Sequence, residues 1–232
     1  MLEYKGVRIA WLGHDTFKIS GSGSSSSSGI AIYIDPYKLR KEARDRADIL
    51  LISHEHFDHL SVEDAKKVVA ADRTTVVTTK SCADGMRGVK VKEIKVVKPW
   101  DKVDVQGVAV EAVPAYNINK INPDTKKPFH PKDAGMIGFV VTVDGVRIYH
   151  AGDTDAIEEL RNLSNIDVAL LPVSGTYVMT ADEAVQAVRM IKPKIAIPMH
   201  YGTIVGSEKD AERFKSMVKE CDVQILKPVD DY

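Results

Sequence analysis

Short runs of apolar residues recur along the chain, separated by polar residues, glycine and proline. Most of these runs are rich in Val and Ile and are too short for buried helices, so they predict β-strands. The predicted strands cover residues 8–19, 30–34, 49–52, 75–79, 92–97, 108–113, 137–143, 146–149, 168–171, 194–198 and 223–226. Asp144-Gly145 separates two of them and favours a type I′ hairpin turn.

Four segments begin with a pattern that starts helices, a Ser, Thr or Asp followed three residues later by a carboxylate. The pairs are Ser61/Asp64, Asp155/Glu158, Thr180/Glu183 and Ser207/Asp210, of which only Thr180/Glu183 is a full capping box. After Thr180 an apolar stripe recurs at helical spacing, and Pro193 ends that helix. Hairpin-like strands followed by strand–helix units occur twice, which predicts sheets packed face to face with helices outside.

Composition favours a globular chain organised as one domain over residues 1–232, with 44% hydrophobic and 28% charged residues. The 32 Lys and Arg nearly balance the 33 Asp and Glu, and the net charge of −1 argues against a nucleic-acid partner. Residues 20–29 are Ser and Gly only. Such a segment cannot pack a core, and it predicts a flexible loop between the first two strands.

The sequence also predicts the setting in which the chain works. No apolar run approaches the roughly 18 residues that a membrane helix needs, and the first residues do not resemble a signal peptide. The two cysteines, Cys82 and Cys221, are far apart and exclude a disulfide framework or a Cys-rich zinc site. We therefore expect no membrane partner and a reducing, cytoplasmic setting.

Residues 53–59, which read SHEHFDH, hold three of the seven histidines. They lie between the strand 49–52 and the helix that starts at Ser61, in a loop of the kind that often carries catalytic groups. His54 and His56 project the same way if this segment is extended, whereas Asp58 and His59 follow the turn and can address a second position. Two adjacent metal ions explain the cluster better than one, and a polar surface turn is the alternative. Imidazole and carboxylate suit zinc, and also manganese, iron or nickel.

Two further residues follow predicted strands. Asp153 lies in the segment YHAGDTD and His200 in the segment IPMHYG. Each alone is more often a structural, hydrogen-bonded residue, but together with the histidine cluster they indicate additional ligands.

These motifs resemble those of the metallo-β-lactamase superfamily. His54-x-His56-x-Asp58-His59 is similar to its HxHxDH signature, and Asp35, Asp153 and His200 are similar to its first motif, its bridging carboxylate and its last motif. The segments WLGH, YHAGD and PMHYG resemble the branch of small hydrolases that includes ascorbate-phosphate lactonase. The resemblance implies an α+β fold, a four-layer αββα sandwich of two packed mixed sheets with outer helices. It places the site at one edge of the two sheets.

The resemblance also implies a ligand set for two divalent metal ions, zinc first, with manganese, iron or nickel as alternatives. One ion is expected on His54, His56 and His130, and the other on Asp58, His59 and His200, with Asp153 bridging them. Asn117 occupies a place where some relatives carry the third-motif histidine. We predict His130 because imidazole is the better ligand; a histidine held in a Pro-rich loop is the alternative.

Four other residues are predicted around these ligands. Asp35 is expected to orient a ligand imidazole, since metal-bound histidines usually donate their other N–H to a carboxylate or carbonyl. His14 is expected to line the pocket, and Tyr201 to contact the substrate. His150 is predicted to be a buried hydrogen-bonding residue.

The expected activity is hydrolysis of an ester, lactone or phosphoester bond in a small soluble metabolite. Two metal ions lower the pKa of a shared water, which one zinc can bring to about 7, and Asp58 and Asp153 are the expected catalytic carboxylates. The open alternatives are a phosphodiesterase or small nuclease, and a non-catalytic binding protein. Lysines 120, 126, 127 and 132 either attract an anionic group or form a solvated loop face. A homo-oligomer is compatible with the sequence.

Overall fold

The computed structural model describes residues 1–21 and 29–229, which form two seven-stranded sheets. The first sheet contains, in spatial order, β1 (Leu2–Tyr4), β2 (Val7–Gly13), β3 (Thr16–Gly21), β4 (Ile30–Ile34), β5 (Ile49–Ile52), β6 (Thr75–Thr78) and β7 (Glu93–Val96). The second contains β14 (Asp222–Val223), β13 (Ile195–Met199), β12 (Val168–Pro172), β11 (Val146–His150), β10 (Ile137–Val143), β9 (Val108–Pro114) and β8 (Lys102–Val105).

The two sheets are built by the same rule. Strands β1 to β4 pair antiparallel and β4 to β7 pair parallel. Strands β8 to β11 again pair antiparallel, and β11 to β14 pair parallel. This confirms that the order of hairpins followed by parallel units occurs twice along the chain.

Strands β4, β5 and β6 of the first sheet are buried on both faces, which explains their nearly continuous apolar runs. In β4, Ile32 and Ile34 join the core that also contains residues of the second sheet, whereas Ala31 and Tyr33 pack in a separate cluster on the other face. Residues of α1 (Val62–Val68) and α2 (Lys80–Gly85) belong to that second cluster.

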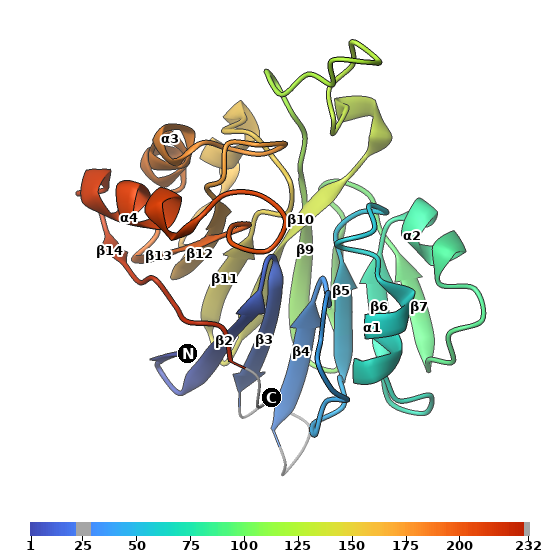
Figure 1. The fold of residues 1–232 in the computed structure, drawn as a ribbon. Helices are drawn as coiled ribbons and strands as arrows, with labels where there is room; N and C mark the ends of the chain where they lie inside the picture. Colours follow the sequence, from blue (N-terminus) through green and yellow to red (C-terminus); the bar gives the residue numbers. More distant parts are fainter. Residues whose placement is uncertain (22–28, 230–232) are drawn as a thin grey trace.

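The second sheet is covered in the same way by α3 (Ala181–Ile191) and α4 (Glu208–Met217), and Figure 1 shows the two helix pairs on opposite sides of the molecule. The predicted four-layer αββα sandwich is therefore confirmed. None of the helices formed by the described residues has both the length and the hydrophobicity of a membrane-spanning segment.

Several local predictions are confirmed. The side chain of Thr180 accepts from the backbone of Glu183, and the Glu183 side chain accepts from the backbone of Thr180, which completes the capping box of α3. Ser61 caps α1. Asp144 and Gly145 both have positive φ, at 48° and 76°, as a type I′ turn requires.

Other local predictions were wrong. Residues 8–19 form two strands, because Gly13 (φ 112°) and His14 (φ 51°) turn the chain between β2 and β3. The Asp155/Glu158 pair does not cap a helix: the Asp155 carboxylate accepts from the backbone N–H groups of residues 118 and 119 instead. Glu158 begins the 3₁₀ helix η2 (Glu158–Asn162).

The boundaries of other elements also differ from expectation. The Ser/Gly loop begins later than residue 20, because Ser20 and Gly21 pair with β4; its residues 22–28 lie outside the described ones. The last strand is Asp222–Val223, not residues 223–226. The short elements β1, β8 and α2 carry no apolar run long enough to predict them.

The parallel strands bring the predicted site residues to one edge of the sandwich. Asp35 follows β4, residues 53–59 follow β5, Asp153 comes after β11 and His200 follows β13. The long segment between β9 and β10, which contains the 3₁₀ helix η1 (Lys132–Ala134), rises above the same strand ends in Figure 1. His130 therefore comes within reach of the residues after β5.

The core between the sheets is expected to be sensitive to truncation. Phe139 on β10 is fully buried, whereas Phe57 in the loop after β5 is 67% exposed. We expect Phe139→Ala to lower the free energy of unfolding by about 3–5 kcal/mol and Phe57→Ala to change it by less than about 0.5 kcal/mol. Urea unfolding of the two variants checks this, and equal midpoints would contradict the described core.

Candidate metal centre

Three imidazole rings meet at the end of β5. The Nδ1 atom of His56 lies 3.1 Å from Nε2 of His54 and 3.1 Å from Nε2 of His130. Three nitrogens bound to one tetrahedral zinc at about 2.0–2.1 Å would lie about 3.3 Å apart, so the observed spacing suits a shared ion. We call His54, His56 and His130 the first ligand group.

Hydrogen bonds orient two of these rings from behind. Asn117 Oδ1 accepts from Nδ1 of His130 at 2.9 Å and from its backbone N–H at 2.9 Å. Ser53 Oγ donates to Asp35 at 2.6 Å, so it accepts from Nδ1 of His54 at 3.0 Å. Each ring thus carries its proton on Nδ1 and presents the Nε2 lone pair to the shared position. The structure places Asn117 behind His130 and not among the three nitrogens.

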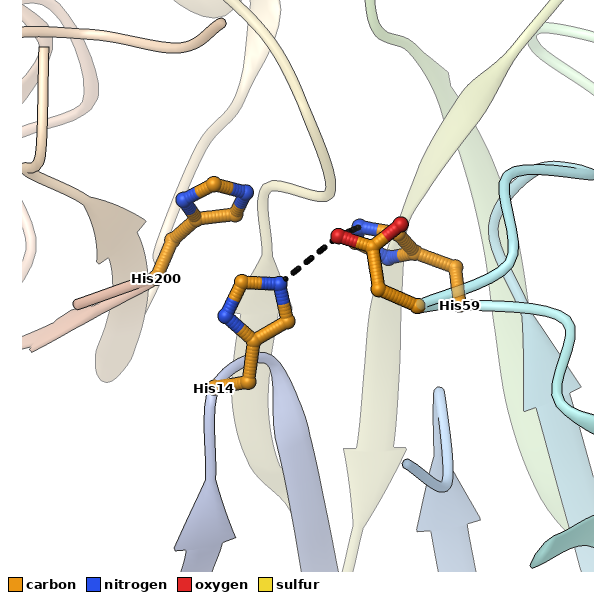
Figure 2. A group of neighbouring side chains, drawn as sticks. His14, His59 and His200 are labelled. Atoms are coloured by element: carbon orange, nitrogen blue, oxygen red, sulfur yellow. Dashed lines mark hydrogen bonds and ion pairs between the residues drawn. The ribbon is translucent and has the colours of Figure 1, made fainter. Parts of the chain in front are cut away.

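A second group of potential ligands lies beside the first. Atoms of His14, Asp58, His59 and His200 all lie within 4.8 Å of one another, and we call these four residues the second ligand group. Figure 2 shows His14, His59 and His200 approaching one another from three separate segments at the strand ends. His14 Nε2 is 2.9 Å from an Asp58 carboxylate oxygen. We predicted that His14 lines the pocket. In the structure it is fully buried and belongs to the second ligand group.

Two residues orient the rings of the second group. Asp35 is fully buried and accepts from Nδ1 of His59 at 2.8 Å, besides accepting from Ser53. Ser174 Oγ lies 3.1 Å from Nδ1 of His200 and donates to the carbonyl of Thr176, so it accepts from the ring. The Nε2 atoms of both rings face the centre of the group.

Asp153 lies between the two ligand groups. Its Oδ2 atom is 3.2 Å from Nε2 of His130 and 3.4 Å from Nε2 of His200, and its Oδ1 atom is 3.2 Å from Nε2 of His59. One carboxylate thus contacts rings of both groups, the position expected of a bridging ligand.

Buried polar atoms at this position make no hydrogen bond within residues 1–21 and 29–229. They are Nε2 of His59, Nε2 of His200 and Oδ1 of Asp153. Most buried polar atoms in proteins are paired, and here lone pairs from imidazole and carboxylate converge. The donor set therefore fits a divalent metal ion.

The two groups differ in protonation. Burial and the neighbouring ring of His59 hold the pKa of His54 well below its usual range, so this ring is neutral and ready to bind a cation. Burial also lowers the pKa of His200, but Asp153 and Asp15 outweigh it and raise that pKa to about 9. Burial raises the pKa of Asp153, but His200 and His59 outweigh it and keep the carboxyl ionised.

Sequence reasoning missed Asp15. This residue is fully buried, its two carboxylate oxygens make no hydrogen bond among the described residues, and one lies 3.5 Å from Nε2 of His59. Asp15, His59, Asp153 and His200 form a further set with metal-ligand spacing. The turn between β2 and β3 was the available signal, and predicting residues 8–19 as one strand concealed it.

The remaining predicted residues lie near the site without entering it. Tyr201 is only 5% exposed, and its ring contacts that of Trp11 with centroids 4.9 Å apart, so it packs in the core. His150 is buried, and its Nε2 donates to the carbonyl of Asp15 at 2.8 Å. It thereby supports the turn that carries His14 and Asp15.

A pocket of about 310 Å³ opens over the ligands. Its lining combines four residues of the site with four apolar residues: His56, Asp58, His130 and Asp153, and Phe57, Phe129, Tyr177 and Ile204. A small molecule can therefore reach both ligand groups from solvent.

Metal binding should depend steeply on pH. His200 is protonated in the metal-free protein at neutral pH because its pKa is about 9, and an ion must displace that proton. The pKa of His59 is also raised, so this ring can release a second proton. We therefore expect the affinity of the second group for Zn²⁺ to rise by at least about tenfold per pH unit between pH 7 and 8. Competition with a chelator of known pH dependence measures this. Affinity that is constant over the range would show that His200 gives up no proton.

The variant Asp15→Asn tests whether the Asp15 carboxylate helps to bind a metal ion or is only buried. The variant keeps the shape of the side chain but removes a charge that stabilises protonated His200, so the metal-free protein should melt at the same or a lower temperature. The affinity of the second ligand group for Zn²⁺ should fall by about 10–100-fold. Exposed Asp124→Asn is the control, and unchanged metal affinity in Asp15→Asn would exclude the role.

Comparisons with known proteins agree with this geometry. The model of the family described as a beta-lactamase superfamily domain matches residues 8–200. A UPF0173 metal-dependent hydrolase of Archaeoglobus fulgidus is 32% identical over 240 residues, which cover 97% of this chain and 98% of the relative. One of Methanopyrus kandleri is 31% identical over 239 residues, covering 97% and 99%.

A solved structure shows the same similarity. A candidate metal-dependent hydrolase of Parabacteroides distasonis superposes with a TM-score of 0.76 at 31% identity, covering 94% of this chain and 92% of the other. These three relatives are not named lactonases, and the finer resemblance to ascorbate-phosphate lactonase stays a prediction. Matched family, fold and full-length relatives lead to one conclusion: the chain belongs to the metallo-β-lactamase superfamily, among its metal-dependent hydrolases.

Proposed function

We propose that this chain is a dinuclear metal-dependent hydrolase that cleaves an ester, lactone or phosphoester bond in a small molecule. The observation that carries the proposal is the position of Asp153, within 3.4 Å of imidazole nitrogens from both ligand groups. Two ions that share one carboxylate can act on one substrate, whereas two separate sites cannot.

The distances between the potential ligand atoms decide which ion each residue would bind. His54, His56 and His130 would hold one, and Asp58, His59 and His200 the other, with His14 and Asp15 beside the second. Divalent ions in such sites act as Lewis acids and activate water for attack at neutral pH.

The chain itself supplies orientation and proton acceptors. Asp58 and Asp153 line the pocket. Burial raises the pKa of Asp58, but the hydrogen bond from His14 outweighs it and holds the carboxyl ionised, as the site histidines do for Asp153. Both carboxylates can thus accept a hydrogen bond from an attacking water and fix the direction of its lone pair.

The pocket lining favours water as the nucleophile. None of the described residues that line it is Ser, Thr, Cys or Lys, the side chains that most often form covalent intermediates. Cys82 is buried away from the pocket, and burial raises the pKa of its thiol. Hydrolysis without an acyl-enzyme intermediate is therefore the reaction that this lining supports.

Metal content and turnover test the proposal together. We expect about two transition-metal ions per chain by elemental mass spectrometry, and hydrolysis of at least one member of a panel of p-nitrophenyl esters, lactones and bis-p-nitrophenyl phosphate. His130→Ala should lose one ion and reduce turnover by at least about 100-fold, because that ion would lose one of its three imidazole ligands. Exposed Lys126→Ala is the control.

Two outcomes would contradict the proposal. A protein that takes up no zinc, manganese, iron or nickel cannot be a metal-dependent hydrolase. A fully loaded protein that is inactive on the whole panel would favour the non-catalytic binding protein instead.

A further inference from the structure

We infer that the site selects an uncharged carboxylic ester or lactone with an apolar group, which Phe57, Phe129, Tyr177 and Ile204 bind. We call these four residues the apolar wall. The inference rests on the proposed function and narrows its substrate class, from any ester or phosphoester to a neutral, hydrophobic one.

The apolar wall is built from four separate loops. Phe57 comes from the loop after β5, Phe129 from the segment between β9 and β10, Tyr177 from the loop after β12 and Ile204 from the loop after β13. Single exposed hydrophobic residues are common on protein surfaces. Four that converge from distant parts of the chain on one pocket are a built feature.

Two members of the wall are direct chain neighbours of candidate ligands. Phe57 lies between His56 and Asp58, and Phe129 directly precedes His130. Three wall residues remain open to solvent, with exposed fractions of 67% for Phe57, 39% for Ile204 and 36% for Tyr177. A bound apolar group would cover this surface while the bond to be cleaved lies over the ligands.

Contacts within the protein hold Phe129 and Tyr177 of the apolar wall in place before any substrate binds. The rings of Phe129 and Tyr177 pack edge to face with centroids 4.7 Å apart. Tyr177 adopts a left-handed backbone conformation (φ 70°), and its carbonyl accepts from Nδ2 of Asn117 at 2.8 Å. Strained backbone that neighbouring contacts hold in place is typical of binding sites, and a preformed apolar surface binds with little ordering cost.

The pocket lining offers no cationic side chain to an anionic group on the substrate. None of the described lining residues is Lys or Arg. The nearby Lys120 contacts both Glu183 and Asp155, and Lys132 contacts Glu159, so carboxylates of the protein already neutralise these two ammonium groups. A phosphate or carboxylate remote from the cleaved bond would meet the aromatic and aliphatic wall, without the cation that such groups need.

The size of the pocket limits the apolar group to a compact one. Its volume of about 310 Å³ lies at the lower end of the range for ligand pockets, roughly 300–1,000 Å³. Each methylene that enters the wall should raise kcat/KM by about threefold to fourfold until the wall is filled.

A chain-length series tests the inference in the metal-loaded protein. We expect kcat/KM to rise at least about tenfold from p-nitrophenyl acetate to the hexanoate. The hexanoate should exceed the mono-p-nitrophenyl ester of adipate, which carries a carboxylate at the same end, by at least about tenfold. A flat series, or a preference for the adipate ester, would overturn the inference.

Two isoleucine variants test whether the dependence of kcat/KM on chain length arises at Ile204. Ile204→Ala should reduce the dependence on chain length and leave the metal content unchanged. Ile121→Ala is the matched control, because Ile121 is also exposed but does not line the pocket. Equal loss of chain-length dependence in both variants would show that Ile204 does not bind the acyl group.

A binding measurement separates this inference from the proposed function. Phenylacetamide is a neutral apolar probe that need not be hydrolysed, and its affinity can be followed by ligand-observed NMR. Affinity that weakens in Ile204→Ala but not in Ile121→Ala supports the apolar wall even if no ester is turned over. Ester turnover without any such difference would keep the hydrolase and overturn the wall.

Discussion

The attraction between the buried Asp153 carboxylate and the imidazoles around it is the interaction on which the rest of the site depends. A charge with so little access to water is costly unless opposite charges compensate it. Rings from both ligand groups lie within 3.4 Å of its oxygens. The same carboxylate raises the pKa of His59 and His200, so it determines which rings carry protons when no cation is bound.

This arrangement requires both halves of the sandwich. The two sheets repeat one order of antiparallel and then parallel strands, and equivalent connections from each half meet at the same edge. The turn after β2 and the long segment after β9 occupy equivalent places in this order, and they supply His14 and His130. Each ligand group combines residues from the two halves, with His130 completing the first and His200 the second. Neither half alone could form a complete site.

Much of the fold could be predicted from the sequence because strands buried on both faces leave long Val- and Ile-rich runs. Three histidines and an aspartate in one loop likewise indicated metal chemistry. Asp15 could not be found in this way, because its role depends on a turn that two left-handed residues create inside an apolar run. The relation between Asn117 and His130 depends on the path of the segment that joins them. In the structure Asn117 accepts hydrogen bonds from His130, whereas in the sequence the two residues were alternatives for the same ligand position.

The amide of Asn117 has a consequence for how relatives of this chain can diverge. Its oxygen holds His130 and its nitrogen holds the carbonyl of Tyr177, so one side chain serves both cation binding and the shape of the pocket. A substitution here would alter both at once, and selection for a new substrate would be penalised by a weakened metal centre. Phe57 and Ile204 line the pocket, and none of their contacts among the described residues orients a ligand side chain. Evolutionary change in substrate range is therefore expected to run through those two positions first.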